Sequence, residues 1–196
     1  MSTTITLPSA PLATTEERPQ TETFTVHVDG SSLRNPGPAR WAAVIFAPDR
    51  DKLVLVGSAP KATNNQMELW AAFEAFSALP LDATGVLYAD SRYVVDGLTM
   101  LREDWARRGW RKSNGQRVVN TTLWKLLGKA ADARPGIRVE WLRGHNGNAG
   151  NDPADRLART EAEKVQAGCD PVGACGLFLE ECALEDAELA AGRAAA

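Results

Sequence analysis

The spacing of apolar residues changes along the chain from a period of two to a period of about 3.6, and this change constrains the fold most strongly. Residues 23–29 alternate between apolar and polar side chains, and residues 41–46 and 53–56 form short runs rich in β-branched and aromatic residues. Such runs predict a meander of three antiparallel strands. Two further apolar runs, at 85–89 and 137–141, are connected through stretches with helical spacing, so we expect them to pair in parallel. The sequence therefore predicts an α/β fold with a mixed five-stranded sheet flanked by helices.

Helical spacing of apolar residues predicts the helices. The stretches concerned are 64–79, 93–101, 123–131 and 152–165. Asn64 and Asn65 are suited to capping the start of the first helix, and Pro80 ends it.

The chain of 196 residues is long enough for one domain with a buried core and terminal segments. Hydrophobic residues make up 44% and charged residues 24%, which is typical of soluble globular proteins and excludes collagen-like, mucin-like and coiled-coil classes. We expect a flexible Thr/Ser/Pro-rich extension at 1–22, a catalytic domain at 23–166 and an acidic extension containing cysteine and alanine at 167–196. No apolar run is long enough to span a membrane, so we expect no membrane partner.

The three cysteines, Cys169, Cys175 and Cys182, all lie in the acidic extension. A metal site made of cysteines alone would need a fourth ligand. An odd number of cysteines, and a first segment without the features of a secretory or mitochondrial signal, predict reduced thiols in a cytoplasmic protein.

The formal net charge of −3 conceals a basic region. Acidic residues are concentrated toward the two ends, and residues 24–167 carry 20 basic against 16 acidic residues. Within residues 102–117 only Glu103 and Asp104 oppose the basic residues, which are Arg102, Arg107, Arg108, Arg111, Lys112 and Arg117. A local excess of positive charge indicates a polyanionic partner such as a nucleic acid, although a solvated helix face has a similar composition.

Four acidic residues occupy positions where a sheet and its helices bring side chains together. Asp29 ends the first predicted strand and Asp90 ends the fourth. Glu68 lies in the first turn of the first helix, and Asp155 lies on the last helix. Taken singly, each has a structural explanation, since Asp caps turns and an acid near a helix start interacts with the helix dipole. Converging carboxylates, however, repel one another unless a cation neutralises them, and hard oxygen ligands suit Mg²⁺ or Mn²⁺.

Each of these acids lies inside a longer motif. The first motif is Val28-Asp29-Gly30-Ser31 with Asn35-Pro36-Gly37-Pro38, and the second is Thr63-Asn64-Asn65-Gln66-Met67-Glu68-Leu69. The third is Asp90-Ser91 followed by Tyr93-Val94, and the fourth joins Arg143-Gly144-His145 to Asn151 and Asp155-Arg156-Leu157-Ala158. In this order and at these spacings, the motifs resemble those of type 1 ribonucleases H over about residues 24–165.

The resemblance implies a ribonuclease H-like fold and an endoribonuclease that cleaves the RNA strand of an RNA/DNA hybrid, leaving a 5′-phosphate and a 3′-hydroxyl. It implies that the four acids are catalytic residues that bind two Mg²⁺ ions, with Mn²⁺ as the alternative. Asp29 would bridge the ions, Glu68 and Asp90 would bind one of them, and Asp155 the other. Two such ions activate water and stabilise the leaving oxygen. The matching histidine, His145, would be a catalytic residue that assists proton transfer or product release, which suits a group that titrates near neutral pH.

The resemblance also implies contacts with the hybrid. An enzyme distinguishes RNA from DNA through 2′-hydroxyls in the wide minor groove, so short polar side chains are needed at the rim of the site. The candidate groove contacts are Asn35, Asn64, Asn65 and Gln66, whose alternative role is turn and cap chemistry. Thr63 and Asn120 match positions that hold a DNA phosphate. The candidates for contacts with phosphates and sugars in the basic region are Trp105, Arg107, Arg108, Trp110, Arg111 and Lys112.

Three positions depart from the family's pattern. Arg34 stands where Gly is usual, Arg92 where Gln is common, and Asn148 where a second loop histidine is frequent. None of these departures removes a metal ligand. Arg34 and Arg92 are candidates for additional phosphate contacts near the site.

Two other functions remain open: a catalytically silent module of the same fold that binds hybrids, and a related nuclease that acts on DNA alone. The four acids argue against the first, because a pure binder has no reason to retain mutually repelling carboxylates. The asparagine-rich rim and the basic region argue against the second. We expect the protein to be a monomer.

Overall fold

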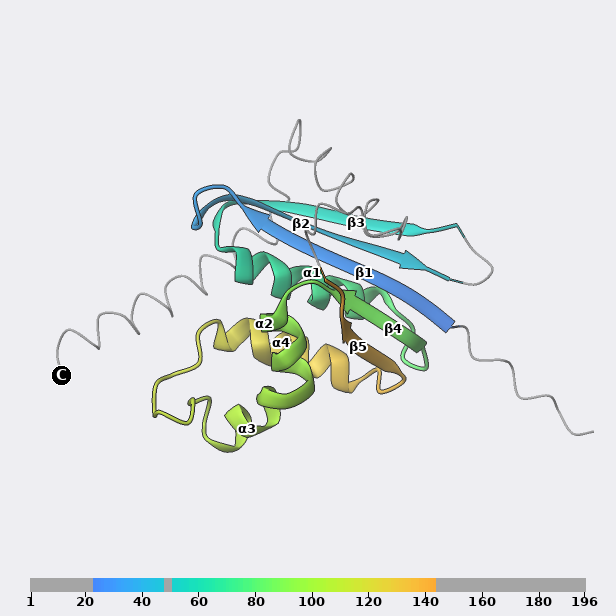
Figure 1. Cartoon of the computed structure of the whole chain (residues 1–196). Helices are drawn as coiled ribbons and strands as arrows, with labels where there is room; N and C mark the ends of the chain where they lie inside the picture. Colours follow the sequence, from blue (N-terminus) through green and yellow to red (C-terminus); the bar gives the residue numbers. More distant parts are fainter. Residues whose placement is uncertain (1–22, 48–50, 144–196) are drawn as a thin grey trace, which may run out of the picture.

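The computed structural model describes residues 23–47 and 51–143, and these residues contain a five-stranded sheet (Figure 1). The strands are β1 (Thr23–Ser32), β2 (Gly37–Phe46), β3 (Leu53–Ala62), β4 (Thr84–Ala89) and β5 (Ile137–Trp141). Their order across the sheet is β3-β2-β1-β4-β5. β2 pairs antiparallel with both β1 and β3, whereas β4 pairs in parallel with both β1 and β5. The predicted mixed sheet, an antiparallel meander extended by two parallel strands, is confirmed.

The strands of the meander are longer than the apolar runs that predicted them. β3 continues to Ala62, and its pairing with β2 includes polar residues such as Arg40 opposite Ser58. β1 likewise continues past Asp29 to Ser32, because its end pairs with β2. The apolar pattern stops before the strands do, since main-chain pairing does not require apolar side chains.

The described helices lie together on one side of the sheet (Figure 1). They are α1 (Asn64–Ala78), α2 (Arg92–Asp96), the π-helix η1 (Gly97–Leu101), α3 (Arg102–Arg107) and α4 (Thr121–Asp132). α1 begins with a capping box, in which the Thr63 hydroxyl accepts from the Gln66 N–H and the Gln66 side chain accepts from the Thr63 N–H. It ends before Pro80, because the residue preceding a proline favours an extended backbone.

One helical segment replaces the short helix predicted at 93–101. α2, η1 and α3 follow one another without a break from Arg92 to Arg107. Gly97, at the start of η1, packs so closely against Trp124 of α4 that a Cβ there would overlap the indole ring. The sequence prediction ends too early because charged residues follow and the apolar spacing is lost.

The core lies between the sheet and these helices. Its fully buried side chains include Val26 from β1, Leu87 from β4, Met67, Leu69 and Phe76 from α1, and Leu123, Trp124 and Leu127 from α4. Burial of each such side chain stabilises the fold by roughly 1.5–3 kcal/mol. The core therefore fixes α1 and α4 against the strands that carry the candidate acids.

Some predicted features lie outside the described residues: the helix at 152–165 and the extensions at 1–22 and 167–196. Within residues 23–47 and 51–143, no helix is both long enough and apolar enough to cross a membrane.

Candidate active site

The end of the parallel ladder between β1 and β4 brings two candidate acids together. The last residues paired across these strands are Val28 and Ala89, and Asp29 and Asp90 follow them directly. Neighbouring strands lie about 4.8 Å apart, so the two carboxylates project from adjacent main-chain positions. β4 ends here, whereas β1 continues by pairing with β2. Asp29 therefore lies within its strand, whereas the sequence predicted that the strand ends at this residue.

Close packing of α1 against β1 adds the third acid. Gly30 follows Asp29, and a Cβ on Gly30 would overlap the main chain of Met67 and Glu68, so glycine is required for this approach. α1 also carries small buried side chains, those of Ala71, Ala72 and Ala75. Glu68 is the fifth residue of α1 and lies in its second turn, one turn later than expected.

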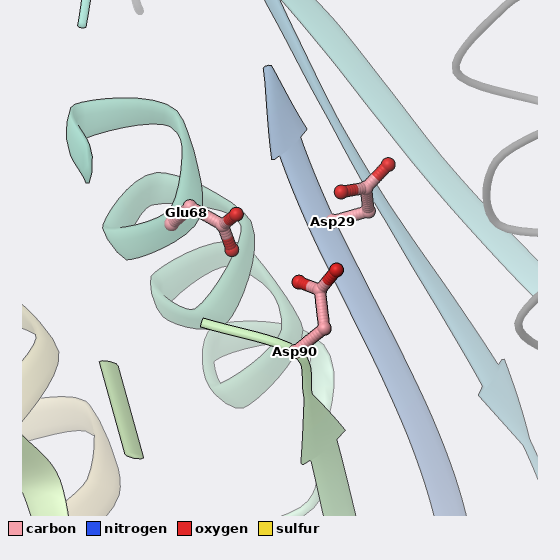
Figure 2. A group of neighbouring side chains, drawn as sticks. All are labelled: Asp29, Glu68 and Asp90. Carbon is pink, nitrogen blue, oxygen red and sulfur yellow. The ribbon is translucent and has the colours of Figure 1, made fainter. Parts of the chain in front are cut away.

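The carboxylates of Asp29, Glu68 and Asp90 form one cluster (Figure 2). Each offers an oxygen within 4.8 Å of the others. Figure 2 shows Glu68 projecting from α1, Asp29 from β1 and Asp90 from the end of β4 into the same space. Glu68 is only 9% exposed, and its buried Oε2 has no hydrogen-bond partner among the described residues.

The surroundings of Glu68 disfavour its negative charge. Burial raises the pKa of Glu68 well above its usual value, and the negative charges of Asp90 and Asp29 raise it further. A buried oxygen without a hydrogen bond costs free energy unless a proton or an ion satisfies it. The three acids therefore fit a divalent cation that prefers oxygen ligands, such as Mg²⁺ or Mn²⁺.

Known sequences match most of the chain. A family model described as RNase H matches residues 21–163. The chain belongs to the ribonuclease H family. A curated relative named Ribonuclease H, from Xanthomonas campestris pv. campestris (strain 8004), is 43% identical over 143 residues, which are 73% of this chain and 94% of the relative. The resemblance that the motifs indicated is thereby confirmed.

Solved structures of ribonucleases H share the fold of this one. The crystal structure of LC9-RNase H1, described as a type 1 RNase H with the type 2 active-site motif, has a TM-score of 0.60 and 30% identity and covers 80% of this chain and 81% of that chain. LC11-RNase H1, solved in complex with an RNA/DNA hybrid, has a TM-score of 0.52 and 19% identity, covering 74% and 99% of the two chains. The second likeness concerns the fold alone.

Two predicted catalytic residues of this ribonuclease H, His145 and Asp155, lie outside the described residues, as does Asn148. The structure thus brings together three of the four predicted metal ligands, Asp29, Glu68 and Asp90.

Asparagine side chains connect the loop after β1 to the start of α1. Asn64 Oδ1 accepts from the Ser32 N–H at 2.7 Å, and Asn35 Oδ1 accepts from the Asn64 N–H at 3.0 Å. Asn35, Asn64 and Asn65 are exposed and form a polar rim one turn of α1 away from the acid cluster. Arg34, in the same loop, is also exposed and has a left-handed backbone with φ of 62°.

Three other predicted contacts stabilise the elements around the site. Thr63 and Gln66 form the capping box of α1, and Gln66 is buried. Asn120 is the N-cap residue of α4, is also buried, and donates from Nδ2 to the Tyr93 hydroxyl at 3.3 Å. Of these three residues, Thr63 is the one with a partly exposed side chain.

The basic arm, defined as residues 102–117, consists of α3 and the turns that follow it. Its exposed cations include Arg107, Arg108, Arg111 and Lys112. Trp110 is half-buried, with the Lys125 ammonium 5.9 Å from its ring centroid. Trp105 is buried, and its ring centroid lies 5.4 Å from that of Trp124 in the core. This corrects the prediction that the Trp105 ring faces a hybrid, because the ring instead anchors α3.

An ion pair joins the basic arm to α4. Both Nη atoms of Arg102 donate to the Asp132 carboxylate, at 2.7 and 2.6 Å. These hydrogen bonds lower the pKa of Asp132, and Gly128 leaves space for the Arg102 side chain. Sequence reasoning missed this pair because its partners are 30 residues apart and only the fold brings them together.

Arg92 and Trp141 lie in contact beside the acid cluster. Arg92 is the exposed first residue of α2, two residues after Asp90, and its guanidinium carbon lies 4.0 Å from the centroid of the Trp141 ring. From the sequence, Trp141 is predicted only as a residue of a strand. The sequence does place Trp141 at the end of a predicted strand. In the fold this strand pairs with the strand that leads to Asp90.

Proposed function

We propose that this ribonuclease H is an endonuclease that hydrolyses the RNA strand of RNA/DNA hybrids and leaves a 5′-phosphate and a 3′-hydroxyl. The observation that carries the proposal is the cluster of Asp29, Glu68 and Asp90, in which a buried Glu68 oxygen has no hydrogen-bond partner among the residues that the structure describes. Family membership supports the same activity, and a ribonuclease H of the same fold was solved with a hybrid.

Two Mg²⁺ ions, or Mn²⁺ in their place, would be held by the acid cluster together with Asp155. When bound, such ions supply an activated water and stabilise the oxygen that leaves phosphorus. The chain's own part is to keep the carboxylates close, through the ladder that ends beside Asp29 and Asp90 and through the contact of α1 with Gly30. His145 would transfer a proton or assist product release, roles that suit histidine because the ordinary pKa of an imidazole lies near neutral pH.

Recognition of the hybrid is assigned to the polar rim and the basic arm. Amide side chains such as those of Asn35, Asn64 and Asn65 both donate and accept hydrogen bonds, as reading of 2′-hydroxyls requires. Thr63, a partly exposed residue, would contact a phosphate. The exposed cations of the basic arm, with the half-buried Trp110, would contact phosphates and sugars without regard to sequence. Arg92 would add a phosphate contact close to the acids.

We also propose that residues 23–166 form the catalytic domain of a cytoplasmic monomer. The family match at residues 21–163 supports this extent.

The test presents one labelled RNA strand in three forms: hybridised to DNA, hybridised to RNA, and single-stranded. We expect internal cleavage of the hybrid only, in Mg²⁺ or Mn²⁺, abolished by EDTA and by Asp90→Asn. Asp82→Asn is the matched control, because Asp82 is an exposed acid near the opposite end of β4 and should be dispensable. The fragments should resist 5′ labelling by a kinase until a phosphatase has acted.

Other outcomes would overturn the proposal. Tight hybrid binding without cleavage in either metal would favour a silent binding module of the same fold. Cleavage of DNA in preference to the RNA strand would favour a DNA nuclease.

A further inference from the structure

Trp141 lies on the strand next to the acid cluster. β5 pairs in parallel with β4, and its last pair is Trp141 opposite Ala89. Asp90 follows Ala89, so Trp141 flanks the strand end from which this acid projects. Ile137 and Val139 belong to the core packing, so the alternation of β5 places Trp141 on the helix side of the sheet, where α2 begins.

The indole N–H of Trp141 supports the main chain that carries Asp90. It donates to the Asp90 carbonyl oxygen at 3.0 Å, while the main-chain N–H of Leu142 donates to the Ala89 carbonyl oxygen at 2.9 Å. β4 ends at Ala89, so the Asp90 carbonyl lies beyond the strand. The indole hydrogen bond therefore extends the support of the ladder by one residue, to an acid of the cluster.

The Trp141 ring also holds a cation. The Arg92 guanidinium carbon lies 4.0 Å from the ring centroid, which is within the range of a cation–π interaction. The Arg92 side chain is nevertheless 61% exposed, and its contact with Asp96, at 3.8 Å, is an exposed pair of the kind that contributes little. A guanidinium that lies against a ring still has N–H donors in its own plane, where a phosphate can accept two of them.

Helix stability does not explain the position of Arg92. Arg92 is the first residue of α2, and positive charge is unfavourable near a helix N-terminus. Trp141 is 37% exposed although tryptophan is usually well buried. An exposed cation therefore lies against an open ring, two residues from Asp90, at a place suited to a phosphate.

We propose that Trp141 is a positioning residue, which holds Arg92 for a phosphate of the hybrid and holds the main chain of Asp90 for the reaction. This inference rests on the proposed function, because it concerns the same cluster and the same substrate. It assigns two separable effects to one side chain. The ring acts on hybrid affinity through Arg92, and the N–H acts on turnover through Asp90.

Two substitutions at Trp141 separate these effects. Trp141→Phe keeps an aromatic ring beside Arg92 but removes the donor, whereas Trp141→Leu removes both. Each is also combined with Arg92→Gln. Arg138→Gln is the matched control, because Arg138 is an exposed arginine of the same strand whose side chain alternates to the other side of the sheet. The affinity for a fluorescent hybrid is measured in EDTA over a salt series, and kcat and KM are measured in Mg²⁺.

We expect Arg92→Gln and Trp141→Leu each to weaken hybrid binding by roughly three- to tenfold and to reduce the salt slope by about 0.9, the effect of one lost phosphate contact. In the presence of Arg92→Gln, Trp141→Leu should add less than about twofold to the loss, since both act through one contact. Trp141→Phe should keep affinity within roughly twofold but lower kcat by about threefold or more, because a hydrogen bond is lost beside a reacting group. Arg138→Gln should change none of these quantities.

Several results would overturn the proposal. Losses of affinity that multiply in the Trp141→Leu and Arg92→Gln double variant would mean that the ring does not act through Arg92. An unchanged kcat in Trp141→Phe would remove the role of the N–H. Metal-free thermal unfolding checks the folding of each variant, and Trp141→Met replaces Trp141→Leu if the latter is unfolded. A wild-type protein that binds hybrids but cannot cleave them would overturn the proposed function, while the binding comparison would still decide the role of the ring.

Discussion

The acid cluster and the basic arm belong to one enzyme but are held by different kinds of interaction. Main-chain geometry holds the cluster, through the end of the ladder between β1 and β4 and the close packing of α1 on Gly30. Side chains hold the arm, through the pair of Arg102 with Asp132 and the packing of Trp105 on Trp124. Catalysis depends on placement to a fraction of an ångström, whereas electrostatic attraction of a polyanion works at approximate positions. The two regions therefore differ in the kind of contact that supports them, as their tasks differ.

The largest expected effect follows from removing a charge inside the cluster. Asp29→Asn should lower kcat by at least about 10³-fold, because metal ligation is worth several kcal/mol to the reaction. The metal-free protein should melt at the same temperature or higher, since repulsion with Glu68 and Asp90 is relieved. Hybrid cleavage and calorimetry in EDTA provide the two measurements. A melting temperature several degrees lower would mean that Asp29 is required for the fold as well.

A pair of glycine substitutions compares the support of the two regions directly. Gly30→Ala should destabilise the protein by roughly 1–3 kcal/mol, because the new Cβ overlaps the main chain of α1. Gly109→Ala, in the basic arm, places its new Cβ more than 4 Å from every described residue except its chain neighbours. It should destabilise the protein by only about 1 kcal/mol, owing to its positive φ of 62°. Urea unfolding of the two variants measures the difference. Equal losses would contradict the distinction between the regions.

A smaller effect is expected from neutralising the arm. The double substitution of Arg107 and Arg108 by Gln should weaken hybrid binding by about tenfold at low salt and reduce the salt slope by up to about 1.8. Asp104 lies within 3.7 Å of one arginine and 3.1 Å of the other, so part of their charge is already balanced. Fluorescence anisotropy over a salt series gives both numbers. At saturating hybrid kcat should not change, and a fall in kcat would mean that the arm also aligns the scissile bond.

The smallest effect concerns the pH dependence of the metal-free protein. Burial, followed by Asp90 and Asp29, raises the folded-state pKa of Glu68 above its usual 4.5. Below pH 4.5 the carboxyl is protonated in both states, and stability is then lost as the pH rises toward the folded-state pKa. Glu68→Gln has no carboxyl group to ionise here, so its stability is not lost in this way. Its melting temperature at pH 7 should be about 3 °C or more above that of the wild type, the shift that corresponds to roughly 1 kcal/mol in the free energy of unfolding.

Melting curves of both proteins in EDTA from pH 4 to pH 8 measure the Glu68 effect. A difference between wild type and Glu68→Gln that stays constant over this range would contradict it. Added Mg²⁺ should stabilise the wild type more than the variant, because it binds the ionised carboxylates of the folded state.

The fold was predictable where apolar patterns and main-chain pairing coincide. β4 and β5 are short apolar runs with turn residues before them, and their observed bounds agree with the prediction to within a residue. The ends of β2 and β3 were missed because polar residues pair there. η1 was missed: it begins at Gly97, which packs against Trp124, and such a contact joins positions that are distant in the sequence.

The three acids of the cluster were predictable because each lies in a local motif, but their supports were not. A basic stretch with interleaved aromatics does not reveal which ring faces the core, and Trp105 was therefore assigned to the wrong environment. Trp141 matters through Arg92 and through Asp90, which is 51 residues away, and no local pattern joins them. Contacts of this kind depend on the register of strands, which a single sequence leaves open.

The π-helix η1 affects the direction in which the basic arm points, because α3 follows it directly in the same helical segment. A π turn contains one residue more than an α-helical turn, and each residue in a helix rotates the chain by about 100°. The direction of the arginines on α3 therefore depends on that extra residue, next to the contact of Gly97 with Trp124. Deleting one residue from η1 would turn the arm by about a quarter of a circle and leave the acids in place. The part of a nucleic-acid backbone that the enzyme contacts would then depend on the number of residues between Asp90 and the arm. The number of arginines on the arm would matter less.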